Sequence, residues 1–304
     1  MRWAIDTNRA SEASRLVAAL WRYWHMRGNI AEGRRWVGEV LAMGGEDSPT
    51  RVRTLEAAGG LAWWNGDMEA SREHYEEALS LLRSFGDDAD MANALYNLAF
   101  PVGFSGRIDE GLQYADRARV LYERLGDEAG VARSHWAMGS VAHFAGRDED
   151  AKVACEKALP IYQRLGDTFD LAWAHRMFGT TLINLGETEE AVAQLTAGLR
   201  LFDEAGDLSG VILHLRDFAQ LAINKGQQER ALTLIGALTA LEEETGMRLL
   251  EGFSEQLEGL EEIRDELGPD RAGEIFERGR NLSRGQAVRF ALDVPAGDLS
   301  TSSH

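Results

Sequence analysis

Apolar residues recur at three- and four-residue intervals along most of this chain, in runs that end at glycine. The run from Ala78 to Leu82, before Gly86, is one example. This spacing places the apolar side chains on one face of an α-helix, and a glycine after such a run is typical of a helix C-cap. An Asp that follows the glycine, as Asp87 does, is a typical N-cap of the next helix. The pattern therefore predicts an all-α protein built from consecutive amphipathic helices.

The glycines fall into two series with a period of 40 residues, the first step alone being 38. The first series is Gly28, Gly66, Gly106, Gly146, Gly186 and Gly226, and the second is Gly86, Gly126, Gly166, Gly206 and Gly246. Two turns in each period predict two helices in each period. The sequence therefore predicts about six helix-turn-helix repeats.

Small residues recur at fixed distances from the first-series glycines. Seven positions before the glycine stand Gly59, Ala99, Gly139, Gly179 and Ala219, and five positions after it stand Gly33, Ser71, Gly111, Ala151, Ala191 and Ala231. Small side chains at facing positions let two helices approach closely. This spacing resembles the signature of the tetratricopeptide repeat (TPR). The resemblance implies a right-handed TPR-like solenoid, although the period of 40 exceeds the usual 34 residues.

The two ends of the chain depart from the repeat. We expect residues 1–11 to be the end of an upstream helix or a leader, 12–246 the TPR repeats, 247–294 a C-terminal helical cap and 295–304 a disordered tail. In the cap, Leu257, Leu260 and Ile263 predict one amphipathic helix, Pro269 begins another, and Ser283 caps a short helix through Leu292. A solenoid needs such a cap because its terminal repeat would otherwise expose an apolar face.

Two groups of residues support a narrower resemblance. They are Leu20 to Trp24, Arg27-Gly28 and Glu32 to Trp36 near the start, and Arg278-Gly279-Arg280, Ser283 and Ala287-Val288 near the end. These segments are similar to the opening and the close of the TPR region in large actinobacterial signalling ATPases, including LuxR-family transcriptional regulators. Those proteins carry a nucleotide-binding domain before the repeats and often a helix-turn-helix after them. The sequence has no Walker loop ending in Gly-Lys-Ser/Thr and no DNA-reading helix pair beyond Leu292. The resemblance therefore implies a sensor region, either as a fragment or as a stand-alone relative.

Charge and composition disfavour several classes of function. The net charge of -18 makes the surface repel phosphate groups, so direct nucleic-acid binding is not expected. No apolar run approaches the roughly 18 to 20 residues that a bilayer requires, and the start lacks the apolar core of a signal peptide. We therefore expect a cytoplasmic protein without membrane contact. The single cysteine, Cys155, cannot form an internal disulfide and is expected in the core.

An enzyme would need a cluster of reactive side chains, for which the histidines are the first candidates. His135 and His175 share one register of adjacent repeats, and Leu55, Leu95 and Leu215 occupy that register elsewhere. This favours a packing role, since no Glu-x-x-His or His-x-x-x-His pattern accompanies them. We therefore expect no cofactor and predict a non-catalytic binding module.

The first helix of each repeat is expected to line the concave surface with a stripe of residues 13, 10, 6 and 3 positions before its turn glycine. The 24 positions of this stripe hold six arginines and one acidic residue, where the average composition would give about four acids. Arginine and aromatic residues anchor ligands through bidentate, stacking and cation–π contacts. The candidate ligand-binding residues are Arg53, Trp63, Asn93, Tyr96, Phe100, Arg133, Trp136, Trp173, Arg176 and Arg216. Pro101 is expected to kink its helix beside Tyr96 and Phe100.

Within the stripe, we expect Arg133, Trp136, Trp173 and Arg176 to converge as a positively charged, aromatic-walled pocket. Such a pocket suits a protein or peptide segment, or an acidic small-molecule effector. In the alternative, the aromatic rings pack between repeats and the arginines pair with nearby acids. For the whole chain we expect a ligand- or partner-sensing module of a signalling or transcriptional regulator. The alternative is a free-standing TPR scaffold that mediates protein–protein interaction.

Overall fold

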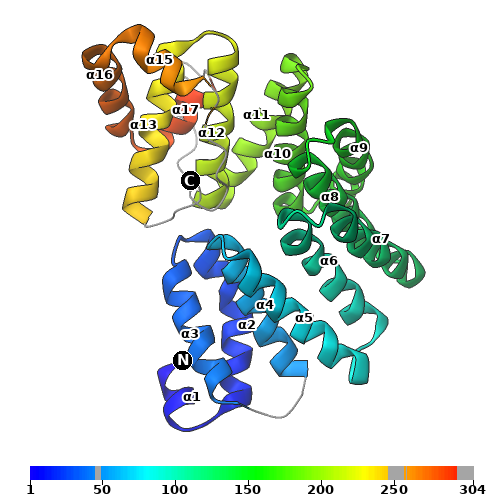
Figure 1. Ribbon diagram of the computed structural model, residues 1–304. Coiled ribbons are helices and arrows are strands. Elements are labelled where there is room, and N and C mark those ends of the chain that lie inside the picture. Colours follow the sequence, from blue (N-terminus) through cyan, green and yellow to red (C-terminus); the bar gives the residue numbers. More distant parts are fainter. Residues whose placement is uncertain (45–48, 246–256, 258, 293–304) are drawn as a thin grey trace.

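The computed structural model describes residues 1–44, 49–245, 257 and 259–292, and within these residues it contains helices and no strands. The helices are α1 Arg2–Asp6, α2 Ala10–Met26, α3 Ile30–Ala42, α4 Pro49–Trp64, α5 Met68–Phe85, α6 Asp88–Phe104, α7 Ile108–Leu125, α8 Glu128–Phe144, α9 Asp148–Leu165, α10 Thr168–Asn184, α11 Thr188–Ala205, α12 Leu208–Asn224, α13 Gln228–Thr245, α15 Leu260–Leu267, α16 Pro269–Arg280 and α17 Arg284–Ala291. Helices α2 to α13 form six consecutive antiparallel pairs (Figure 1). The prediction of an all-α, TPR-like solenoid is confirmed.

The turns between these helices form as the glycine and aspartate pattern predicts. The glycines with positive φ include Gly28, Gly66, Gly106, Gly126, Gly146, Gly166, Gly186, Gly206 and Gly226, all between 66° and 90°. Residues with a Cβ rarely adopt this left-handed conformation, which explains the glycine at each turn. The side chains of Asp67, Asp87, Asp127, Asp167 and Asp207 accept hydrogen bonds from backbone N–H groups in the first turn of the following helix. Gly86 departs from the series, with φ at -73°.

The small residues allow the two helices of a repeat to touch. A Cβ at Gly59 would lie 2.8 Å from the ring of Tyr75 on α5, and one at Gly179 would lie 2.6 Å from Cγ of Leu195 on α11. Ala151 and Ala191, on the facing second helices, have no exposed surface. The contact within each repeat is therefore a close approach of two helices that leaves room only for small residues at these positions.

The ends of the array also follow the sequence pattern. The first repeat helix begins at Ala10, after the short helix α1. Pro269 begins α16, and Ser283 caps α17 with a capping box completed by Gln286. Leu257 lies before α15 rather than within it. Most of the predicted segment 247–259, and the predicted tail 295–304, lie outside the described residues.

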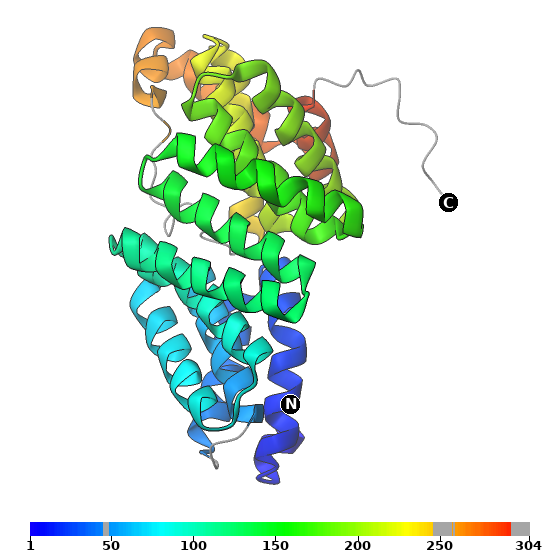
Figure 2. The same ribbon diagram turned by 90° about the vertical axis from the view of Figure 1, so that its right-hand side faces the viewer.

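The array curves so strongly that its first repeats lie beside α10 and α12 (Figures 1 and 2). His25 at the end of α2 contacts Ser209 at the start of α12, 184 positions later in the chain. The rings of Trp64 on α4 and Trp173 on α10 lie 5.4 Å apart, centroid to centroid. The solenoid therefore closes on itself within the described residues, and the first helices of all six repeats border one concave space.

The small-residue contact predicts a sharp difference between two substitutions. Ala151→Trp places a large ring between the helices of one repeat, so the free energy of unfolding should fall by about 3 kcal/mol. Glu189→Trp places the same ring on an exposed position of α11 and should change it by less than about 0.5 kcal/mol. Urea denaturation followed by circular dichroism measures both. Equal losses would contradict the assignment of the contact.

Candidate ligand-binding cavity

A cavity of about 1320 Å³ occupies the concave side, lined mainly by the first helices α2, α4, α6, α8, α10 and α12. Nine of the ten candidate residues line it: Trp63, Asn93, Tyr96, Phe100, Arg133, Trp136, Trp173, Arg176 and Arg216. The tenth, Arg53, lines a smaller hollow of about 280 Å³ with Arg15. Pro101 also lines the cavity, and α6 continues past it to Phe104. Most of the stripe therefore faces one shared cavity, as its register implies, while its N-terminal end faces the smaller hollow.

A contact between His25, Trp64, Asp207 and Ser209, hereafter the closure contact, joins the first repeats to the sixth. The imidazole of His25 stacks on Trp64 with ring centroids 3.8 Å apart. The hydroxyl of Ser209 donates to Oδ1 of Asp207 at 2.5 Å, which leaves its oxygen to accept from Nε2 of His25 at 3.1 Å. Burial, with the nearby Arg22 charge, lowers the pKa of His25 to about 3, and burial raises the pKa of Asp207. The contact therefore depends on a neutral imidazole.

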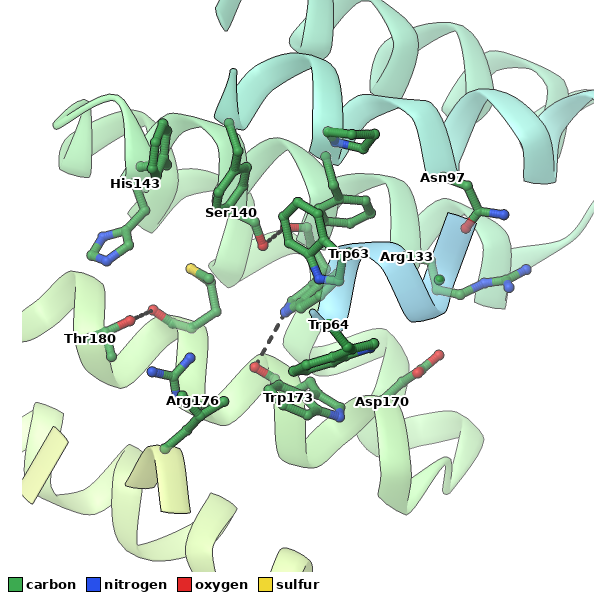
Figure 3. A pocket seen from close by; sticks show the side chains of 18 of the residues that line it. Trp63, Trp64, Asn97, Arg133, Ser140, His143, Asp170, Trp173, Arg176 and Thr180 are labelled. Carbon is green, nitrogen blue, oxygen red and sulfur yellow. Dashed lines mark hydrogen bonds between the residues drawn. The ribbon is translucent and has the colours of Figure 1, made fainter. Parts of the chain in front are cut away.

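Aromatic rings form the middle of the cavity wall. The ring of Trp63 lies 4.8 Å from Phe104 and 5.7 Å from Phe100, and Phe100 lies 5.2 Å from Trp136. The indole N–H of Trp136 donates to the backbone carbonyl of Trp173 at 3.3 Å, which links α8 to α10 (Figure 3). These rings come from three repeats and offer a ligand a largely apolar surface with fixed edges.

Arg133 and Asp170 lie on one side of these rings (Figure 3). The guanidinium carbon of Arg133 is 5.6 Å from the ring centroid of Tyr96 and 5.3 Å from that of Tyr122. Burial raises the pKa of Asp170, while the charge of Arg133 opposes the shift. Glu56, whose carboxylate accepts from Asn93 at 2.6 Å, also has a pKa raised by burial. This side thus holds a stacked cation and two carboxyl groups in a region of reduced hydration.

Arg176 lies on the other side of the rings, and the structure corrects the charge expected there. Its Nε lies 2.7 Å from Oδ2 of Asp217, and its Nη2 donates to Oδ1 at 3.0 Å. The two side chains are only 15% and 3% exposed, so they form a buried ion pair with one hydrogen bond. Asp217 lies in the next repeat, at a register outside the stripe. The sequence pattern of the stripe therefore does not include its negative charge. The expectation that this pocket is positively charged is wrong at Arg176, because Asp217 neutralises its charge.

The charge of the whole cavity wall also differs from the positive charge that the stripe predicts. The described lining residues include four arginines, Arg22, Arg133, Arg176 and Arg216, and four acids, Glu56, Asp148, Asp170 and Asp217. The cavity is therefore balanced in formal charge rather than positive. It still differs from the protein as a whole, which carries a net charge of -18. Selectivity in such a cavity depends on where each charge lies, not on its sum.

His175 and Cys155 are buried, and His135 is half-buried. Nδ1 of His175 lies 2.6 Å from Oε1 of Gln194 on the second helix of its repeat, and burial lowers the pKa of both His135 and His175. Burial raises the pKa of the Cys155 thiol to about 12, so the reactive thiolate is disfavoured. At the cavity rim, Nδ1 of His143 contacts Oδ1 of Asp148 at 2.6 Å. Across the described residues, no group of three or more His, Cys, Asp or Glu is placed to hold a metal ion.

Sequence reasoning did not find several residues that shape the cavity. Trp64 follows Trp63 directly, yet it lies off the stripe and packs on His25 and Trp173. Asp170 and Asp217 also lie in other registers of their helices. No local pattern marks these residues, because their roles arise only where the curved array brings distant repeats together.

No protein-family model matches the chain, and no curated protein matches it in sequence. Several solved structures are similar in fold. One is a Rap protein complexed with Competence and Sporulation Factor, at 14% identity and a TM-score of 0.59, with 93% of this chain and 96% of that one covered. Another is aspartyl phosphate phosphatase F from Bacillus subtilis, at 12% identity and a TM-score of 0.55, with coverage of 90% and 95%. A third is the apo form of RapI, at 13% identity and a TM-score of 0.52, with coverage of 81% and 98%.

At these identities the likeness concerns the fold alone. The structural similarity covers most of each chain, so it extends over many consecutive helices and is not limited to one helix pair. No described helix is both long and apolar enough to cross a bilayer.

The closure contact predicts a pH-dependent stability. The pKa of His25 is lowered from 6.5 to about 3 in the folded chain, so its contribution is complete above pH 6.5 and is lost as the pH falls toward 3. His25→Gln keeps an N–H donor for Ser209 but does not titrate. Between pH 6 and pH 4, its unfolding free energy should fall less steeply than that of the parent, by up to about 1.4 kcal/mol per pH unit. Urea denaturation at each pH measures the unfolding free energy of both proteins. The other titrating groups are common to both and cancel in the difference between the two free energies. If the two plots of unfolding free energy against pH were parallel, the assignment to His25 would be wrong.

The buried ion pair predicts a structural role for Arg176. Arg176→Ala leaves the carboxylate of Asp217 buried without its partner, so the free energy of unfolding should fall by about 3 kcal/mol or more. Arg176→Ala combined with Asp217→Ala removes both charges and should recover part of that loss. Thermal melting of the single and double variants tests this. A single variant as stable as the parent would show that the pair contributes nothing to the fold.

Proposed function

We propose that this chain is a non-catalytic binding module that takes a short peptide segment or a small molecule into its central cavity. The observation that carries this proposal is the size of the cavity and its lining by all six first helices. A cavity of about 1320 Å³ exceeds the roughly 300 to 1,000 Å³ of most small-molecule sites and is lined from six first helices. Solenoids commonly use their concave surface for binding, and here the curvature of the array deepens that surface into a cavity.

The wall indicates the chemistry of the ligand. Its aromatic middle suits an aromatic or other flat apolar group, and Arg133 on one side suits a carboxylate. The balanced charge argues against a strongly acidic segment, because Glu56 and Asp170 would repel additional carboxylates. We therefore infer a ligand with one carboxylate and one aromatic group, separated by polar atoms such as peptide amides.

The position of the cavity also supports a sensing role. A ligand that touches Trp63 on α4 and Arg216 on α12 would contact both sides of the closure contact at once. Such a ligand binds the closed array better than any opened one, so it shifts the population toward the closed form. This coupling fits the sensor region of a signalling or transcriptional regulator, which the resemblance of the chain ends implies. The structural neighbour solved with a bound factor supports the same class of role.

The proposal predicts which arginine matters for binding. A fluorescein-labelled library of five-residue peptides, each with one Trp and one Glu, should contain members that bind the parent by fluorescence anisotropy. Arg133→Met keeps the apolar stem but removes the cation, so the bound members should weaken at least tenfold, or about 1.4 kcal/mol. Arg53→Met removes an arginine from the smaller hollow outside the cavity and should change binding less than twofold.

Melting temperatures of both variants should stay close to that of the parent, which separates lost binding from lost folding. The proposal fails if no peptide of the library binds the folded chain, or if Arg53→Met weakens binding as much as Arg133→Met does.

A further inference from the structure

The four acids of the cavity wall differ in how their carboxylates are matched by the protein. Asp148 and Asp217 each contact a basic side chain, and Glu56 accepts a hydrogen bond from a side-chain amide. Asp170 is different, because its carboxylate has neither a hydrogen bond nor an ion pair with any side chain that the structure describes. Asp170 is therefore the acid of the wall that is most open to a ligand.

The position of Asp170 in its helix does not explain its place in the cavity. It lies in the first turn of α10, where an acid favourably meets the partial positive charge of a helix N-terminus. That interaction is possible at full exposure, since Asp90 holds the same register of α6 and is exposed outside the cavity. Asp170 is instead partly buried, and burial raises the pKa of its carboxyl group. The fold thus keeps a partly dehydrated carboxylate at the cavity surface without a donor of its own.

Aromatic rings and two arginines surround this carboxylate. Trp173 follows Asp170 by one turn on the same face of α10, and its ring lies 5.4 Å from that of Trp64 on α4 (Figure 3). The positive charges of Arg133 from α8 and Arg22 from α2 act on Asp170, although neither of these two side chains forms an ion pair with it. Positive and negative groups therefore lie near one another here without direct contact.

Such an arrangement suits a ligand that carries both signs of charge close together. A lone cation would be attracted by Asp170 but repelled by the two arginines, and a lone anion would meet the opposite conflict. A ligand with a cation and a carboxylate a few bonds apart satisfies Asp170 and Arg133 at once. The ring faces beside Asp170 also attract a cation. A primary ammonium fits best, because it is compact and has three donors for a carboxylate that has none.

We propose that Asp170 binds a primary ammonium group of the ligand, beside the carboxylate that Arg133 binds. This inference rests on the proposed function, since it concerns the same cavity. The ammonium comes from the free amino terminus of a short peptide or from a free amino acid, and the aromatic side chain of either packs on the rings of the wall. Asp170 is then the residue that selects ligands with an unmodified amine.

Acetylation of the amine tests this inference. Members of the peptide library that bind the parent are prepared with fluorescein at the carboxyl end and with the amino terminus either free or acetylated. Acetylation removes the positive charge and should weaken binding to the parent at least tenfold. Asp170→Asn should weaken binding of the free peptide at least tenfold and that of the acetylated peptide less than twofold. Asp265→Asn, the same change at an exposed position of α15, should weaken neither.

This comparison separates the effect of charge from that of size. An acetyl group that only collides with the wall would weaken binding to Asp170→Asn as much as to the parent. That result, or equal binding of the free and acetylated peptides by the parent, overturns the inference and leaves the proposed function standing. Circular dichroism melts show whether each variant is folded, and Asp170→Ser provides the same comparison if Asp170→Asn is not.

A second pair of probes identifies the source of the amine. Tryptophan and indolepropionic acid share an indole and a carboxylate, but only tryptophan has an ammonium group. If isothermal titration calorimetry shows tryptophan binding at least tenfold more tightly, and Asp170→Asn abolishes the difference, the source is a free amino acid. Binding of the free peptides alone assigns the source to a peptide amino terminus. If neither the peptides nor the two small molecules bind the folded chain, the proposed function fails and this inference fails with it.

Discussion

The close approach of the two helices within each repeat is the constraint on which the rest of the structure depends. At Gly111 a Cβ would lie 2.8 Å from the carbonyl oxygen of Ala99, so the two backbones are almost in contact. Because similar contacts recur with a period of 40 residues, each repeat adds a similar rotation and the array bends steadily. A larger residue at one contact would therefore change the path of the array as well as the stability of one helix pair.

That path brings the first repeats to α10 and α12, where polar and aromatic groups replace the small-residue contact. His25 and Asp207 are both buried there, and burial favours the neutral form of each. A contact of this kind costs more to form than an apolar one, since its polar atoms must be desolvated and then matched. Because its polar atoms must be matched, this contact joins two specific surfaces, at His25 and Ser209, which are 184 positions apart in sequence. Closure of the array thus depends on this specific contact and on the neutral form of His25.

The cavity shows how a strongly acidic protein can hold arginines in a sheltered site. Arg176 is neutralised by Asp217 from the next repeat, whereas Arg133 lies against the rings of Tyr96 and Tyr122. The first arginine is fixed by a buried partner and contributes to the fold. The second lies against ring faces and donates to the Tyr122 hydroxyl at 3.5 Å, and its ion pair with the partly exposed Asp127, at 3.9 Å, is looser than the pair of Arg176 with Asp217. Two residues of the same type on one stripe therefore have different capacities for binding.

The sequence by itself determined the helices, the turns and the contact within each repeat, because these depend on residues close together in the chain. Gly106 and Asp127 mark turns in any helical repeat, and Ala151 marks a close approach. It also placed Trp63 and Trp136 on the concave side, since register along a helix is local. The pairing of Arg176 with Asp217 and the contact of Trp64 with Trp173 were decided only by the tertiary structure. The reason is that a small rotation per repeat, repeated six times, decides which distant side chains meet, and no local pattern encodes that sum.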